Sequence, residues 1–135
     1  MIKRIMEGKT LIAIVGSLED AAWGNNFITE NELPMQIGIM RKNKVNTDNH
    51  VHKMRDRKIK SISNEFHFIV RGKARVSLFG LKKKLITKIM LCPNMFCALF
   101  NGGHGYELVK DDTLMIEVKN GEFSEDLTLD KEKIK

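Results

Sequence analysis

The side chains of this sequence best suited to metal chemistry are its four histidines and the carboxylates near them. His50 and His52 are two positions apart, and side chains two apart in a β-strand lie on the same face. Both imidazoles could therefore bind one ion. By the same rule Glu65 shares a strand face with His67, whereas Phe66 takes the opposite face.

A third imidazole comes from His104, which lies between the glycines at positions 103 and 105. Small neighbours let the backbone approach a crowded site. Three neutral imidazoles and one carboxylate suit divalent Fe, Mn, Ni, Zn or Cu, and residue type alone does not choose between them. An HxH pair on its own equally fits a solvated strand. The metal prediction depends on the order of the signals, in which Glu65 opens an aromatic strand and His104 follows about 40 residues later.

Three further side chains are candidates for proton transfer. His67 is one step along the strand from Glu65, where an imidazole could act as general acid or base; the alternative is a hydrogen-bonded core histidine. Glu117 could serve as a base if the pocket is polar, or be merely solvated if the apolar face of its strand packs the core. Glu107 is the third candidate.

The elements that must position these side chains are mainly strands, because most segments alternate with a period of two. One helical turn is expected over residues 17–23, with Ser17 as N-cap. The Arg71-Gly72 turn predicts a hairpin between the strands on either side of it. The expected strands cover residues 10–15, 35–41, 65–70, 74–79, 85–91, 96–100, 106–109 and 113–118, and 50–53 begins or belongs to another. The sequence therefore predicts an all-β sandwich or barrel.

A length of 135 residues fits one domain, which we expect to span 1–135 with a barrel core at about 34–120 and a charged tail at about 121–135. The two cysteines, Cys92 and Cys97, are expected to be reduced thiols of a cytoplasmic protein. No apolar run reaches the length of a membrane span, so no membrane partner is expected.

The formal net charge of +6 is concentrated between residues 41 and 60, where eight Lys and Arg face two Asp. This stretch is either a collar for an anionic carbohydrate or a solvated loop. Nucleic acid is not expected as a partner, because aromatic residues do not interleave with the charges. Phe66, Phe68 and Val70 would leave an apolar patch unless covered, which favours a homodimer.

The order of these residues resembles the two motifs of the cupin superfamily. The first motif has HxH, then a Glu, six residues and a Gly, and Glu65-Phe-His-Phe-Ile-Val-Arg-Gly72 reproduces its second half. The second motif ends in a glycine-rich loop bearing a His, as does the stretch from Pro93 to His104. The resemblance implies a cupin-type jelly-roll barrel, a double-stranded β-helix, with His50, His52, Glu65 and His104 as metal ligands. The twelve residues between His52 and Glu65 exceed the spacing of the general motif.

The chain is also similar to small bacterial single-domain cupins associated with surface polysaccharide and glycan biosynthesis. The likeness rests on residues 34–41, 50–53, 102–105 and 117–121. The likeness itself does not define a biochemical role. The first hypothesis is a metal-dependent isomerase or epimerase acting on a sugar or nucleotide-sugar, in which the ion acts as a Lewis acid on a carbonyl. Two alternatives stay open: a non-catalytic module that binds or senses a sugar or acid, and an Fe(II)-dependent oxygenase.

Overall fold

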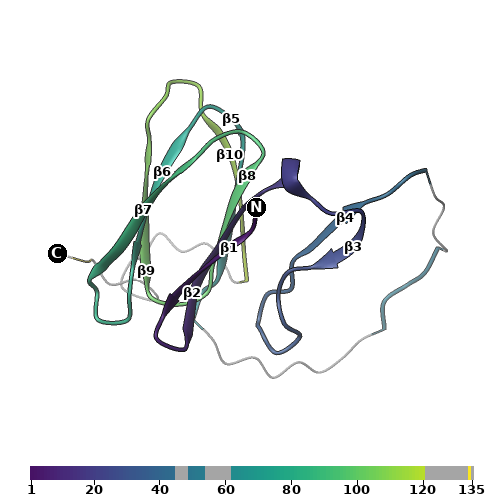
Figure 1. Ribbon diagram of the computed structural model, residues 1–135, viewed down its shortest axis with the longest axis horizontal. Coiled ribbons are helices and arrows are strands. Elements are labelled where there is room, and N and C mark those ends of the chain that lie inside the picture. Colours follow the sequence, from purple (N-terminus) through teal and green to yellow (C-terminus); the bar gives the residue numbers. More distant parts are fainter. Residues whose placement is uncertain (45–48, 54–61, 121–133, 135) are drawn as a thin grey trace.

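Ten strands and one short 3-10 helix form the secondary structure in the computed structural model, which describes residues 1–44, 49–53, 62–120 and 134 (Figure 1). The predicted all-β class is confirmed. The predicted helical turn is also confirmed: η1 (Leu18–Asp20) begins after Ser17, whose hydroxyl accepts a hydrogen bond from the Glu19 N–H at 3.2 Å.

The largest sheet has five antiparallel strands. Their order across the sheet is β1 (Lys3–Glu7), β2 (Thr10–Ser17), β8 (Met95–Leu99), β5 (Glu65–Arg71) and β10 (Leu114–Lys119). The predicted strands over 10–15, 65–70, 96–100 and 113–118 are found here within a few residues. Strand β1 was not predicted, and β1 and β2 both precede the predicted core range of 34–120.

A second sheet has three antiparallel strands in the order β7 (Leu85–Leu91), β6 (Ala74–Phe79) and β9 (Gly103–Leu108). A separate two-stranded ladder joins β3 (Gly24–Phe27) to β4 (Gly38–Arg41) and lies beside the five-stranded sheet (Figure 1). Within the described residues no ladder connects the three sheets, so they do not close into a continuous barrel.

The core lies between the five-stranded and three-stranded sheets. Along β6 alternate residues are buried, and Val76 and Leu78 pack with Ile12 and Ile69 of the larger sheet in one cluster. The inward positions of β5 are Glu65, His67 and Ile69, all buried. Two polar side chains of this strand therefore face an otherwise apolar interior.

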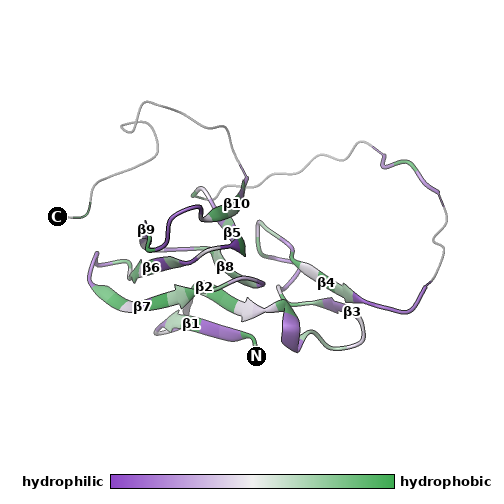
Figure 2. Cartoon of the chain, turned by 90° about the horizontal axis from the view of Figure 1, so that it is seen from above, coloured by the Kyte–Doolittle hydropathy of each residue, from purple (hydrophilic) through white to green (hydrophobic). Residues whose placement is uncertain are grey.

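The opposite face of the five-stranded sheet is covered by the segment that contains β3 and β4. Phe66 stacks on Phe96 with ring centroids 5.5 Å apart, and Ile37 and Ile39 pack in the same cluster. Figure 2 shows this segment, seen from above, to one side of the two larger sheets. The apolar face that Phe66 and Phe68 present is thus partly covered within the chain itself.

Two strand predictions are wrong. Residues 49–53 are exposed and belong to no strand. The predicted strand covered only 50–53, and an alternation over four residues is too short to distinguish a strand from a loop. The expected hairpin across Gly72 does not form: β5 pairs with β8 and β10, whereas β6 pairs with β7 and β9. The turn passes from one sheet to the other, because the inward residues of both strands face the same core.

The predicted charged tail falls mostly outside the described residues. Ile134 is described, and its side chain lies against Gly103 at the start of β9, where a larger residue would meet it.

Candidate metal centre

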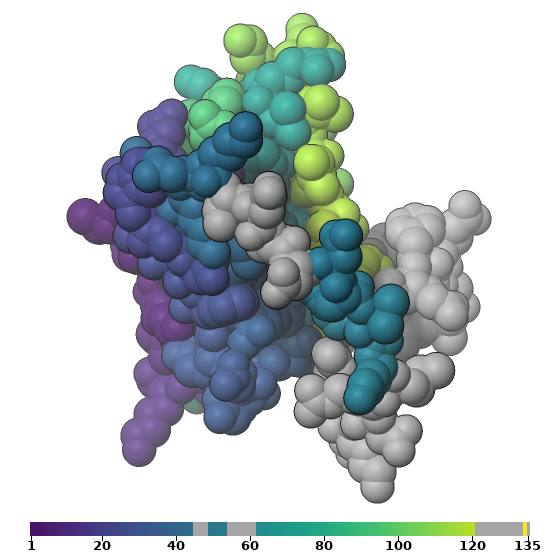
Figure 3. Space-filling model, turned by 90° about the vertical axis from the view of Figure 1, so that its right-hand side faces the viewer, coloured from purple at the N-terminus to yellow at the C-terminus, as the bar shows by residue number. Residues whose placement is uncertain are grey.

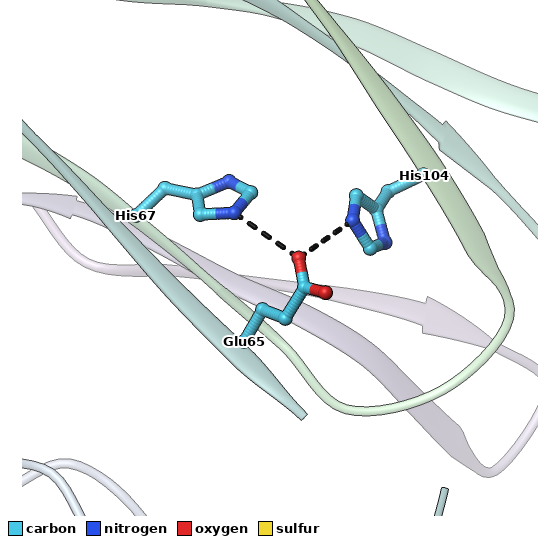
Figure 4. Close-up of side chains that lie close together, drawn as sticks. All are labelled: Glu65, His67 and His104. Atoms are coloured by element: carbon cyan, nitrogen blue, oxygen red, sulfur yellow. Dashed lines mark hydrogen bonds and ion pairs between the residues drawn. The ribbon is translucent and has the colours of Figure 1, made fainter. Parts of the chain in front are cut away.

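Glu65, His67 and His104 bring three possible ligand atoms together at the edge of the core, where Glu65 and His67 are buried and His104 is exposed. These atoms all lie within 4.8 Å of one another, and no other such group of His, Cys, Asp or Glu occurs in the part of the chain that the structure describes. Figure 4 shows the Glu65 carboxylate between the two imidazoles, which approach it from different strands. The predicted carboxylate and glycine-flanked histidine are thus brought together.

The alternation of β5 places the first two side chains. Glu65 and His67 are two positions apart and both point inward; the His67 side chain is fully buried and that of Glu65 is 7% exposed. In the sheet His67 lies opposite Cys97 of β8 on one side and Glu117 of β10 on the other. The neighbouring strands therefore present their own inward residues to the centre.

Strand β9 of the smaller sheet supplies the third side chain. His104 lies opposite Leu78 of β6, which is fully buried, so its imidazole is on the inner face. The turn before it needs glycine, because Gly102 has φ of +71° and a β-carbon there would collide with the carbonyl oxygen of Phe79. The His104 side chain is 29% exposed, so the centre opens toward solvent on the β9 side.

Hydrogen bonds link the three side chains. One oxygen of Glu65, Oε2, lies 2.8 Å from His104 Nε2 and 3.2 Å from His67 Nε2. The hydrogen bonds from His104 and then His67 hold the pKa of the Glu65 carboxyl well below its usual range, and outweigh the opposing effect of burial. Glu65 is therefore ionised at neutral pH and available as an anionic ligand.

His67 has a second carboxylate at the same ring nitrogen. Glu117 Oε2 lies 3.2 Å from His67 Nε2, and the Glu117 side chain is 36% exposed. The other ring nitrogen of His67, Nδ1, is buried and has no hydrogen-bond partner among the residues that the structure describes. The polar contacts described for this imidazole are those to the two carboxylates.

The donor set fits a divalent ion. Two imidazole nitrogens and a carboxylate oxygen form the three-ligand set of many catalytic zinc sites and of non-haem iron sites, which keep further positions for water or substrate. Glu65, His67 and His104 would hold such an ion, which would supply Lewis acidity at this centre.

The structure does not bring the HxH pair to this group. The rings of His50 and His52 are 5.0 Å apart, centroid to centroid, and both residues are exposed. Figures 1 and 2 show residues 49–53 on the far side of the β3–β4 ladder from β9, and Figure 3 shows them at the surface. The chain on either side, 45–48 and 54–61, lies outside the described residues. The assignment of His50 and His52 as ligands stays a prediction.

Of the three proton-transfer candidates, two lie at the centre and one does not. His67 and Glu117 are in contact at the centre. Glu107 points to the other face of the smaller sheet, where it lies opposite Arg75 and pairs with it at 2.8 Å. Tyr106 is closer to the centre: its ring is 5.6 Å from that of His67, and it is 49% exposed.

The sequence reasoning assigned His67 to proton transfer and missed it as a possible ligand beside Glu65. The period of two that placed His50 with His52 also places His67 with Glu65, so the signal was available. Cys97, by contrast, is not part of the group: it is a buried free thiol whose pKa burial raises to about 12.

Comparison with protein-family models, curated proteins and solved structures gives no significant match to this chain. Over the described residues, no helix has the length and apolar character needed to cross a membrane.

Proposed function

We propose that this protein is a metal-binding cupin of the jelly-roll type, with one divalent ion held by Glu65, His67 and His104. The observation that carries the proposal is the convergence of two imidazole nitrogens on one carboxylate oxygen beside an apolar core cluster. Burial of these polar groups costs stability unless they are paired or bind an ion, so a functional reason for keeping them is expected.

The reaction that we propose is isomerisation or epimerisation of a sugar or nucleotide-sugar. When bound, the ion would supply Lewis acidity toward a substrate carbonyl. In this proposal Glu117 takes a proton from the neighbouring carbon; its partly exposed carboxylate and its contact with His67 support that role. Tyr106, half exposed beside His67, orients a hydroxyl group of the substrate. The assignment to surface glycan synthesis rests on the sequence resemblance alone.

The metal part is tested by elemental analysis of the purified protein and by titration of metal-free protein with Zn(II), Mn(II) and Fe(II). We expect one ion per chain, with binding lost in Glu65→Gln and His104→Ala. The matched control is Glu107→Gln, which removes an exposed carboxylate on the opposite face. Equal binding by all variants would refute this centre.

The catalytic part is tested by incubating the metal-loaded protein with a panel of nucleotide-sugars in deuterated water. An isomerase or epimerase exchanges a substrate C–H proton with solvent, and Glu117→Gln should slow this exchange while leaving metal bound. Ligand-induced thermal stabilisation without chemical change would instead support the binding or sensing module.

A second candidate is an Fe(II)-dependent oxygenase, because two histidines and one carboxylate are the ligand set of that enzyme class. Oxygen consumption that requires Fe(II) and His104, measured with an oxygen electrode, would support it over the isomerase.

We also propose that the protein is a homodimer. Leu114, Ile116 and Val118, the outward residues of β10, are 41%, 49% and 53% exposed, and a second subunit would cover them. Sedimentation equilibrium decides this, and a monomer at all concentrations would refute it.

A further inference from the structure

Asn64, directly before Glu65, is one of the few polar residues that the core buries completely. Amide side chains are mostly exposed in folded proteins, and a buried one must satisfy its hydrogen-bonding groups. The Asn64 amide group donates from Nδ2 to the carbonyl oxygen of Phe100 at 2.8 Å, and its Oδ1 accepts from Asn120 Nδ2 at 3.2 Å.

The backbone of Asn64 is bonded to the same partner. Its N–H donates to Asn120 Oδ1 at 2.8 Å, and its carbonyl oxygen accepts from the Asn120 N–H at 3.3 Å. Asn64 and Asn120 therefore form a reciprocal pair in which side chains and backbones are both used. We call the bonds among Asn64, Asn120 and the Phe100 carbonyl the asparagine clasp.

The clasp joins the three chain segments that carry the candidate centre. Asn64 precedes β5, which holds Glu65 and His67. Asn120 follows β10, which holds Glu117, and Phe100 follows β8 and leads into the turn before His104. Each of these segments ends or begins at the clasp.

The clasp lies at the end of the sheet, where backbone pairing fixes the strand register least firmly. Backbone ladders fray at their ends, and Glu65 is the first residue of its strand. A slip of β5 by one residue against both β8 and β10 would turn Glu65 and His67 to the opposite face. Bonds made by Asn64 on both its side chain and backbone fix the register at that end.

We propose that Asn64 is a positioning residue of the metal centre: it acts through the clasp to hold Glu65 within reach of His67 and His104. The expected effect of Asn64 on metal affinity rests on the proposed metal-binding function. The competing interpretation is a purely structural asparagine, whose loss would lower stability without changing the geometry of the centre.

The experiment compares three variants of the full chain. Asn64→Ala deletes the buried side chain at the centre of the clasp. Asn120→Ala deletes the side chain of its exposed partner, which should affect folding less. The control is Thr29→Val, which deletes another buried hydrogen bond, from the Ile37 N–H to Thr29 Oγ1 at 2.8 Å, in the segment that covers the far face of the sheet.

Three measurements are made on each variant. Titration with Co(II), followed by visible absorption, gives metal affinity. Long-range ¹H–¹⁵N spectra of the histidine rings in metal-free protein report the hydrogen bonds from His67 and His104 to Glu65. Thermal denaturation gives the stability of each variant for comparison.

We expect both clasp variants to weaken Co(II) binding by about tenfold or more, as loss of outer contacts does at other metal sites, and to shift the ring ¹⁵N signals of His67 and His104. Thr29→Val should lower the melting temperature without either change. The inference is overturned if the clasp variants keep wild-type ring signals, or move them no more than Thr29→Val. If the wild type binds no Co(II), the proposed metal function fails, but the ring signals still decide whether Asn64 positions Glu65.

Discussion

Replacement of Glu65 by Gln tests the interactions at the candidate centre directly. The substitution keeps the size of the side chain but removes the negative charge that accepts hydrogen bonds from His104 at 2.8 Å and His67 at 3.2 Å. A hydrogen bond to a charged group contributes about 1.5–3 kcal/mol. The bond to His104 is short but partly exposed to solvent, and the bond to His67 is long but buried, so both are taken at the lower end. We therefore expect a loss of about 3 kcal/mol at neutral pH.

The loss must depend on pH in a defined direction. Interactions in the folded state lower the pKa of Glu65, so the carboxylate stabilises the protein above the unfolded pKa of about 4.3. This contribution declines as the pH falls below that value toward the folded pKa. The difference between wild type and Glu65→Gln should accordingly be largest at neutral pH and shrink under acid conditions.

Urea unfolding with chelator present, at several pH values from neutral to acid, measures this difference without metal. The control is Glu107→Gln, whose exposed ion pair with Arg75 should contribute about 0–1 kcal/mol. A stability of Glu65→Gln equal to wild type at neutral pH, or a difference that persists unchanged in acid, would refute the reasoning.

Three further predictions follow from the same geometry. His104→Ala should weaken Zn(II) binding strongly, whereas the double variant His50→Ala/His52→Ala should leave it unchanged. Isothermal titration calorimetry measures both affinities, and a large loss of affinity in the double variant would support His50 and His52 as ligands. Gly102→Ala should destabilise the protein by about 1–3 kcal/mol, because the positive φ is strained and the new methyl group meets the Phe79 carbonyl; an unchanged melting temperature would contradict this. In native protein at neutral pH Cys97 should resist thiol reagents and react only on unfolding, because it is fully buried and its pKa is raised to about 12. Mass spectrometry locates the labelled cysteine, with the less buried Cys92 as the comparison; rapid labelling of Cys97 in native protein would disprove the prediction.

Local alternation was enough to find most strands of this chain. Residues 74–79 and 85–91 were predicted at the bounds that β6 and β7 have. Apolar and other residues largely alternate along 74–79, and the lysine-rich turn at 82–84 separates the two strands. Glu65 and His104 were predicted for the centre, and the structure brings them to 2.8 Å. The turn at Gly72 was also predicted, but the sequence did not show that the strands on either side of it belong to different sheets.

The sequence by itself determined the class of fold and the chemical types available for a site. Period-two patterning depends only on residues close in the chain, and it places Glu65 with His67 on one strand face. The tertiary structure alone decided which distant groups meet. That β10 pairs with β5, and so delivers Glu117 to His67, is a long-range pairing set by packing of the whole core. The same holds for Asn64 and Asn120, 56 positions apart, because no local pattern specifies which strand ends a closed hydrogen-bond network will join.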